Sequence, residues 1–108
     1  LNLNYQPHPV TLGFEGSEGF VEEPYWNLNG DPSTIQVLAT SVEDGESQPQ
    51  VWTKEKHRGR VFVCLPGHFT WTHDDPLYRL LVFRGICWAA QWPLNTLDDG
   101  VFIGARFQ

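Results

Sequence analysis

The sequence contains no methionine and only two cysteines, Cys64 and Cys87, among its 108 residues. Two core thiols are expected, and a disulfide between them stays open because their spacing does not imply one. No Cys/His cluster has the spacing of a zinc site. No apolar run approaches the ~18 residues that cross a bilayer, and no signal peptide is present in this stretch. Because a natural chain normally starts with Met, we expect a processed or excised piece of a protein. A cytoplasmic location is favoured, although nothing fixes the compartment.

Basic residues are absent from the first part of the chain. Residues 1–50 contain eight Asp and Glu side chains and no Lys or Arg, whereas residues 51–108 contain all seven bases and five acids. An acidic surface repels phosphate groups, so we expect neither nucleic acid nor anionic membrane among the partners. The chain is 41% hydrophobic and 19% charged, which is typical of a globular protein rather than a disordered one.

One stretch combines a strand, an exposed turn and a helix. The apolar run Val61–Leu65 has no alternation, which predicts a strand buried on both faces. Pro66-Gly67 ends the strand, and His68 follows at what would be its carboxyl end. In open α/β sheets, ligands bind outside the carboxyl ends of the strands. His68 is therefore the first candidate for a functional residue.

The pattern turns helical over Pro76–Ala90, after a polar loop at Thr70–Asp75. Asp75 is predicted to cap this helix, and Pro76 suits its first turn, where the missing N–H is not needed. Apolar residues cover most of the circumference, which is typical of a helix buried on more than one side. One helix cannot cover both faces of a sheet, so we expect these residues to be the back part of a larger α/β domain.

The remaining elements are short. Leu1–Asn4 is expected to be a short strand or a frayed end. Further strands are predicted at Ile35–Thr40, Val51–Thr53 and Val101–Ile103, and loops at Thr11–Gly19, Ser41–Pro49, Lys54–Gly59 and Leu94–Gly100. The tight polar connection between Val51–Thr53 and the strand that begins at Arg60 predicts an antiparallel pair.

Seven segments, in one consistent order, carry a resemblance to a known family. They are His8–Thr11, Glu22–Tyr25, Val51–Lys54, Gly59–Phe62, Leu65–His68, Asp75-Pro76 and Arg84–Ala89. Together they resemble the trehalose-utilisation (ThuA-like) family, whose fold is similar to that of class I glutamine amidotransferases. The resemblance implies an α/β, flavodoxin-like three-layer sandwich. It covers the C-terminal portion only, so residues 1–108 are expected to be the C-terminal part of a single ThuA-like domain whose N-terminal half is absent.

The resemblance also bears on His68. In the amidotransferase relatives, a histidine at the equivalent strand end is the base for a catalytic cysteine, and a glutamate two residues later orients its ring. This chain has Thr70 there, and Cys64 and Cys87 both fall in predicted core positions. Glutamine hydrolysis is therefore not expected, whereas a catalytic or ligand-binding role for His68 is. The alternative is a ring that only bonds a loop carbonyl.

Five further residues are candidates for ligand binding. The resemblance places Glu22, Glu23 and Tyr25 near the pocket, where carboxylates and a phenol suit sugar hydroxyls. Gly67 adjoins His68, and Trp71 offers an apolar face for a sugar ring, as Trp26 also could. The alternative is an acidic surface loop beside a buried Tyr-Trp pair.

A second polar cluster, His73, Asp74 and Asp75, allows two interpretations. With His68 these side chains could bind a metal. We favour a structural role in which Asp75 caps the helix and Asp74 faces its positive end. No metal and no cofactor are therefore predicted.

Two classes of function remain open. The resemblance implies a protein of carbohydrate utilisation that binds or transforms trehalose, a related disaccharide or a keto-sugar in a pocket at the strand ends around His68. The alternative is a non-catalytic binding or scaffold module on an amidotransferase-like fold that lacks the nucleophilic cysteine. The partner expected in the first case is a small sugar, and the sequence fixes neither enzymatic activity nor oligomeric state.

Overall fold

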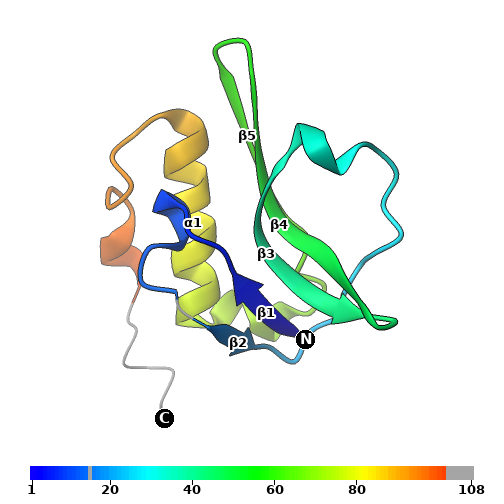
Figure 1. Ribbon diagram of the computed structural model, residues 1–108. Coiled ribbons are helices and arrows are strands. Elements are labelled where there is room, and N and C mark those ends of the chain that lie inside the picture. Colours follow the sequence, from blue (N-terminus) through cyan, green and yellow to red (C-terminus); the bar gives the residue numbers. More distant parts are fainter. Residues whose placement is uncertain (15, 102–108) are drawn as a thin grey trace.

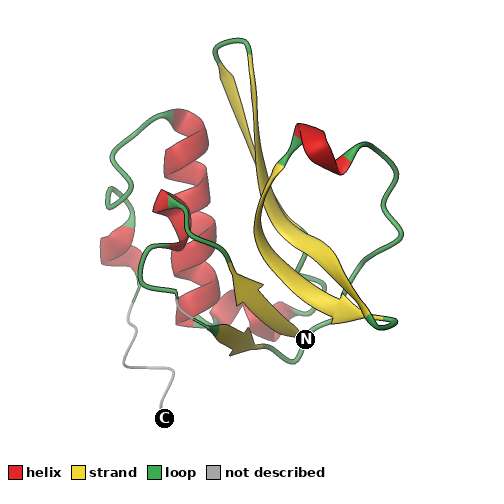
Figure 2. Ribbon diagram, viewed as in Figure 1, coloured by secondary structure: helices red, strands yellow, loops and turns green. Residues whose placement is uncertain are grey.

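The computed structural model describes residues 1–14 and 16–101. These residues form an α/β fold with one antiparallel sheet and one α-helix (Figures 1 and 2). The strand order is β2-β1-β3-β4-β5. The strands are β1 (Asn2–Tyr5), β2 (Ser17–Gly19), β3 (Gln36–Glu43), β4 (Glu46–Lys56) and β5 (Gly59–Cys64). Helix α1 is Pro76–Ala90, and four 3₁₀ turns are η1 (Pro9–Thr11), η2 (Pro32–Thr34), η3 (Thr70–Asp74) and η4 (Asp98–Gly100).

Helix α1 begins and ends where the sequence predicts. The Asp75 carboxylate accepts a hydrogen bond from the Leu77 amide at 2.9 Å, and Pro76 occupies the first turn. At the other end Gln91 adopts a left-handed conformation, with φ 59°, and its amide bonds the carbonyls of Cys87 and Trp88. Both ends therefore satisfy backbone groups that a helix leaves open.

The hairpin of β3 and β4 corrects two predicted loops. Ser41–Pro49 does not form a loop, because β3 and β4 continue pairing to Glu43↔Glu46 around the turn at Asp44-Gly45. Thr11–Gly19 is likewise not all loop, since it contributes to η1 and contains β2. The charged turn predicted over Lys54–Gly59 is shorter than expected, because β4 continues to Lys56 and β5 begins at Gly59, which leaves only His57 and Arg58 in the turn. The antiparallel pairing of β4 with β5 is confirmed, with Thr53 opposite Phe62.

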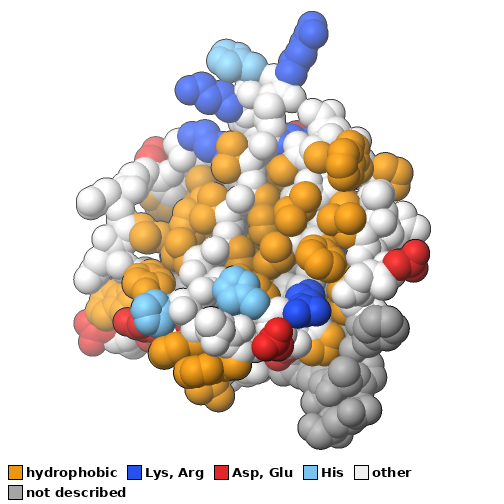
Figure 3. Space-filling model, turned by 180° about the vertical axis from the view of Figure 1, so that it is seen from behind, with side chains coloured by type: hydrophobic (Ala, Val, Ile, Leu, Met, Phe, Trp, Pro, Cys, Tyr) orange, Lys and Arg blue, Asp and Glu red, His pale blue; other side chains and the backbone are white. Residues whose placement is uncertain are grey.

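Strand β5 lies at an edge of the described sheet, which corrects the expectation of a strand buried on both faces. Its inner residues face α1, where Phe62 meets Gly85, and its outer residue Val61 is 49% exposed. On α1, Ile86 is 46% exposed. Figure 3 shows apolar side chains gathered across the middle of the rear face. The helix is thus covered by the sheet on one side and remains accessible on another.

The core lies between the sheet and α1. Its fully buried side chains come from the N-terminal segment, the central strands and the helix, and include Leu3, Val10, Leu38, Ala39, Val51 and Leu81. Residue 101 follows η4 without strand structure, and the rest of the terminal strand predicted at Val101–Ile103 lies outside the described residues. Among the described helices, none has the length and apolar character needed to cross a membrane.

Candidate functional site

His68 is carried to the surface by a tight path between β5 and η3. Buried Pro66 accepts a hydrogen bond at its carbonyl from the Tyr78 hydroxyl at 2.8 Å, which fixes the turn against α1. Gly67 follows with φ 143°, and a Cβ at this position would lie 2.8 Å from the same hydroxyl. Position 67 therefore requires glycine for both conformation and space. Gly67 shapes the turn that presents His68.

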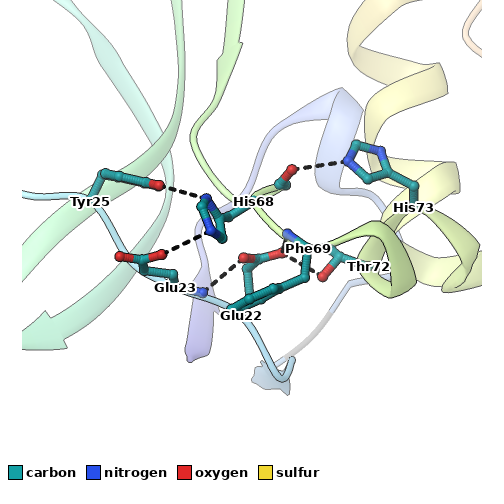
Figure 4. Close-up of polar contacts among 8 residues, drawn as sticks. Glu22, Glu23, Tyr25, His68, Phe69, Thr72 and His73 are labelled. Atoms are coloured by element: carbon teal, nitrogen blue, oxygen red, sulfur yellow. Dashed lines mark hydrogen bonds and ion pairs between the residues drawn. The ribbon is translucent and has the colours of Figure 1, made fainter.

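The imidazole of His68 lies between two side chains of the segment 22–25 (Figure 4). Its Nδ1 is 3.0 Å from the Tyr25 hydroxyl, and its Nε2 is 3.4 Å from the Glu23 carboxylate. An ionised carboxylate only accepts hydrogen bonds, so the tautomer that carries its proton on Nε2 suits the contact with Glu23. In that tautomer Nδ1 accepts the Tyr25 O–H. The side chains of His68 and Glu23 are about half exposed, so a ligand can reach them.

Glu22 points away from His68 and links the segment 22–25 to the residues that follow His68. Its carboxylate accepts hydrogen bonds from the Thr72 hydroxyl at 2.5 Å, the Phe69 amide at 3.2 Å and the Glu23 amide at 2.8 Å. Burial alone would raise the pKa of Glu22, but these hydrogen bonds outweigh it, so the pKa lies below its ordinary value. A buried carboxylate with this many donors is a positioning residue. It aligns Glu23 and Tyr25 with His68.

Aromatic rings border the His68 side chain. Phe69 meets the His68 ring edge-on at 4.8 Å between centroids. Trp71 stacks on Phe69 at 4.4 Å and 9°, and its indole N–H donates to the Val21 carbonyl at 2.7 Å. Trp71 is nevertheless 51% exposed. It is held at one edge and one face, and the rest of the ring is available to a ligand.

The residues of the second polar cluster turn away from one another. His73 Nε2 lies 3.0 Å from the Gly67 carbonyl, and Asp74 forms an ion pair with Arg79 at 3.1 Å. Asp75 caps α1, as predicted. Within residues 1–14 and 16–101, no three His, Cys, Asp or Glu side chains are arranged as metal ligands.

Comparison with protein-family models matches residues 1–89 to ThuA, described as trehalose utilisation. The chain belongs to this family. No curated protein and no solved structure matches it.

Neither of the two thiols in this ThuA-family chain is suited to act as a nucleophile at the site. Both are free in the described structure, and Cys87 is buried in the core. Burial raises the pKa of the Cys64 thiol to about 12, so the thiolate is scarcely populated at neutral pH. Cys64 and Cys87 therefore serve as small apolar side chains.

Sequence reasoning missed three parts of this ThuA-family site. Phe69 and Thr72 receive their roles from contacts with His68, Trp71 and Glu22, which a local pattern does not reveal. Gln50 is fully buried, and its side-chain N–H donates to the Tyr25 carbonyl at 2.8 Å. The one sequence signal for this contact was the position of Gln50, directly before Val51-Trp52 in a strand. A side-chain amide that faces the core needs a hydrogen-bond partner.

Proposed function

We propose that this chain binds a trehalose-type disaccharide or a related keto-sugar at the surface formed by His68, Glu23, Tyr25 and Trp71. The observation that carries the proposal is the bridging of the His68 ring between Tyr25 and Glu23 beside an exposed, stacked indole. Membership of a family described as trehalose utilisation supports a sugar as the ligand. The proposal goes beyond family membership because it assigns the ligand to particular side chains.

The chemistry of this arrangement suits a sugar. A ring of C–H groups packs against the exposed indole of Trp71, while hydroxyls exchange hydrogen bonds with Tyr25 and Glu23. The order Tyr25, His68, Glu23 also provides a route for a proton. When Tyr25 takes a proton from a sugar hydroxyl, it passes its own proton to Nδ1, and the resulting imidazolium faces the Glu23 carboxylate. Such a relay supports reversible proton abstraction from a hydroxyl group.

A specific observation supports the second candidate, a binding or scaffold module without catalysis. Both ring nitrogens of His68 are already engaged by Tyr25 and Glu23, and the two described cysteines are buried or protonated. Three surface hollows among the described residues are lined by residues other than His68, whose own side chain is about half exposed. An open surface of this kind binds a partner without excluding water, which most proton-transfer enzymes require.

We also propose that the fold extends to the flavodoxin-like, three-layer arrangement, with this chain as the C-terminal part of the domain. Two observations support it. Within the described sheet, the outer edge of β5 pairs with no further strand. The outward residues Val61 and Ile86 are about half exposed, which is expected of apolar side chains that a further layer of the domain would cover.

Titration calorimetry separates the two candidate functions. The chain is titrated with trehalose, with a second glucose disaccharide and with an oxidised glucoside. Saturable heat with one of these sugars, lost in Tyr25→Phe, is the expected result, because the substitution removes only the hydroxyl that faces His68. Absence of heat with the whole panel would contradict sugar binding and favour the scaffold module.

A further inference from the structure

A hollow separate from the His68 site lies between the segment 28–35 and strand β4. Its volume is about 450 Å³, within the range of small-molecule sites. One wall is formed by residues of the 28–35 segment, and the other by Ser47, Gln48, Pro49 and Trp52. None of the residues assigned above to sugar binding lines this hollow.

The wall contributed by the 28–35 segment is fixed in shape. Asn27 and Gly30 have positive φ angles of 61° and 132°, which bend the chain as few residues can. Asp31 then caps η2 by accepting from the Ser33 amide at 2.9 Å and from the Ser33 hydroxyl at 2.8 Å. The hollow is therefore preformed, and a ligand need not order this segment.

The β4 wall is shaped by an irregularity in the sheet. Ala39 pairs with Val51 and Thr40 with Pro49, so Gln50 is an extra residue on β4. A bulge of this kind redirects side chains. The side chain of Gln50 holds the Tyr25 carbonyl at 2.8 Å, which ties the start of the long segment to β4.

The lining offers one aromatic ring and several unused polar groups. Trp52 is half-buried and lies in register between Val37 on β3 and Val63 on β5, which restrict the motion of its indole. The polar side chains of Asn29, Ser47 and Gln48 also line the hollow. In the described part of the chain the side chains of these three residues make no hydrogen bond, so their bonding capacity is available to a ligand.

The charge of the lining disfavours an anionic ligand. Asp31 is the one charged side chain among the described residues that line the hollow, and its Oδ1 already accepts two hydrogen bonds from Ser33. Among the described residues no Lys or Arg lines it, and the first fifty residues contain no base, so the described lining offers an anion no counter-charge.

We propose that this hollow is a second binding site, for a neutral polyhydroxylated ring such as a hexopyranose unit. The apolar face of the ring packs against Trp52, and its hydroxyls bond the side chains of Asn29, Ser47 and Gln48. An aromatic ring flanked by amide and hydroxyl groups matches a molecule that has one C–H face and a periphery of hydroxyls.

The test is a two-dimensional ¹⁵N–¹H NMR titration of the 108-residue chain with methyl α-D-glucopyranoside. Amide shifts that saturate with a Kd on the order of millimolar are expected in residues 28–35 and 47–52. Trp52→Ala is expected to weaken binding about tenfold, which corresponds to ~1.4 kcal/mol. Trp52→Phe retains a flat ring and should weaken it less, and Gln48→Ala leaves the indole in place while removing one hydrogen-bonding group. His68→Ala should leave these shifts unchanged, so failure of the His68 proposal and failure of this one are distinguishable.

Three outcomes would overturn the proposal. The first is an absence of shifts in these two segments at about 50 mM ligand, well above the expected Kd. The second is equal or tighter binding of glucose 6-phosphate, which would show an anion site. The third is unchanged binding in both Trp52→Phe and Gln48→Ala, two variants that keep most of the native packing.

Discussion

Gly85 of α1 lies directly against the aromatic ring of Phe62 on β5. A Cβ at position 85 would come within 2.3 Å of the Phe62 ring, a distance that real side chains do not adopt. The helix therefore approaches the strand more closely here than any other residue type allows. This contact helps to fix the position of α1 over β5, the strand that leads to His68.

Gly85→Ala is expected to lower the free energy of unfolding by about 1–3 kcal/mol, because the added methyl group collides with the Phe62 ring. Urea denaturation measures the change. The control is Ile86→Ala, a neighbouring and 46% exposed position, where a smaller loss is expected. If Gly85→Ala stabilised the protein, as helix propensity alone predicts, the close packing of Phe62 would be wrong.

Glu22 gives stability a defined pH dependence. Its pKa is lowered in the folded chain from the ordinary value of 4.5, because hydrogen bonds to the carboxylate outweigh burial. Its contribution is therefore fully present above about pH 4.5 and is lost as the pH falls through the lower folded value.

The variant that tests this pH dependence is Glu22→Gln. It can place an NH₂ group where the carboxylate oxygen accepts hydrogen bonds from Thr72 and Phe69. It is expected to lower the free energy of unfolding by about 1–3 kcal/mol at neutral pH and to remove this part of the acid-side decline. Glu23→Gln, at a half-exposed position, is the control and should change stability by less than ~1 kcal/mol. Identical acid-side declines in the wild type and in Glu22→Gln would contradict the assignment.

Asp75 should matter for stability rather than for metal binding. Asp75→Ala removes the acceptor for the Leu77 amide and is expected to lower the free energy of unfolding by about 0.5–2 kcal/mol. Asp75→Asn keeps a capping oxygen and should lose less. Thermal unfolding with and without a chelator measures both effects. A melting temperature that falls when chelator is added would indicate a metal ligand instead.

The helix was predictable from local chemistry, whereas the position of the strand that precedes it was not. Asp75-Pro76 is a start signal that acts within one turn, and the structure follows it. An unbroken apolar run such as Val61–Leu65 is typical of a doubly buried strand, but burial depends on elements that no local pattern specifies. The polar residues of Ser41–Pro49 indicated a loop, whereas they pair in β3 and β4 on either side of the Asp44-Gly45 turn, and Pro49 is tolerated at the irregularity beside Gln50.

The candidate site was likewise predictable only in part. A histidine after Pro66-Gly67 is recognisable in the sequence, and glycine is required there by its φ of 143°. Tyr25 is separated from His68 by 43 positions, and only the family resemblance suggested their proximity. The anchoring role of Glu22 rests partly on backbone amides, which every residue but proline possesses, so no pattern marks it.

The exposed apolar side chains predict dye binding by the native chain. Val61, Ile86 and Trp92 are each about half exposed, and such surface binds a fluorescent apolar dye. Dye fluorescence at neutral pH and 25 °C, well below the unfolding transition, is the expected result. A sharp cooperative unfolding transition without dye binding would contradict the proposal that this fold packs against further layers.

The central claim is that His68 binds the ligand rather than supporting the fold. Its most direct test is the affinity of His68→Ala for whichever sugar produces heat in calorimetry, measured with thermal unfolding of the same sample. The account predicts at least a tenfold loss of affinity and a stability change of less than about 0.5 kcal/mol, because the side chain is about half exposed. His57→Asn, at an exposed turn position with φ 57°, is the control and should change neither quantity. Unchanged affinity in His68→Ala, together with a loss of several kcal/mol in stability, would contradict the account.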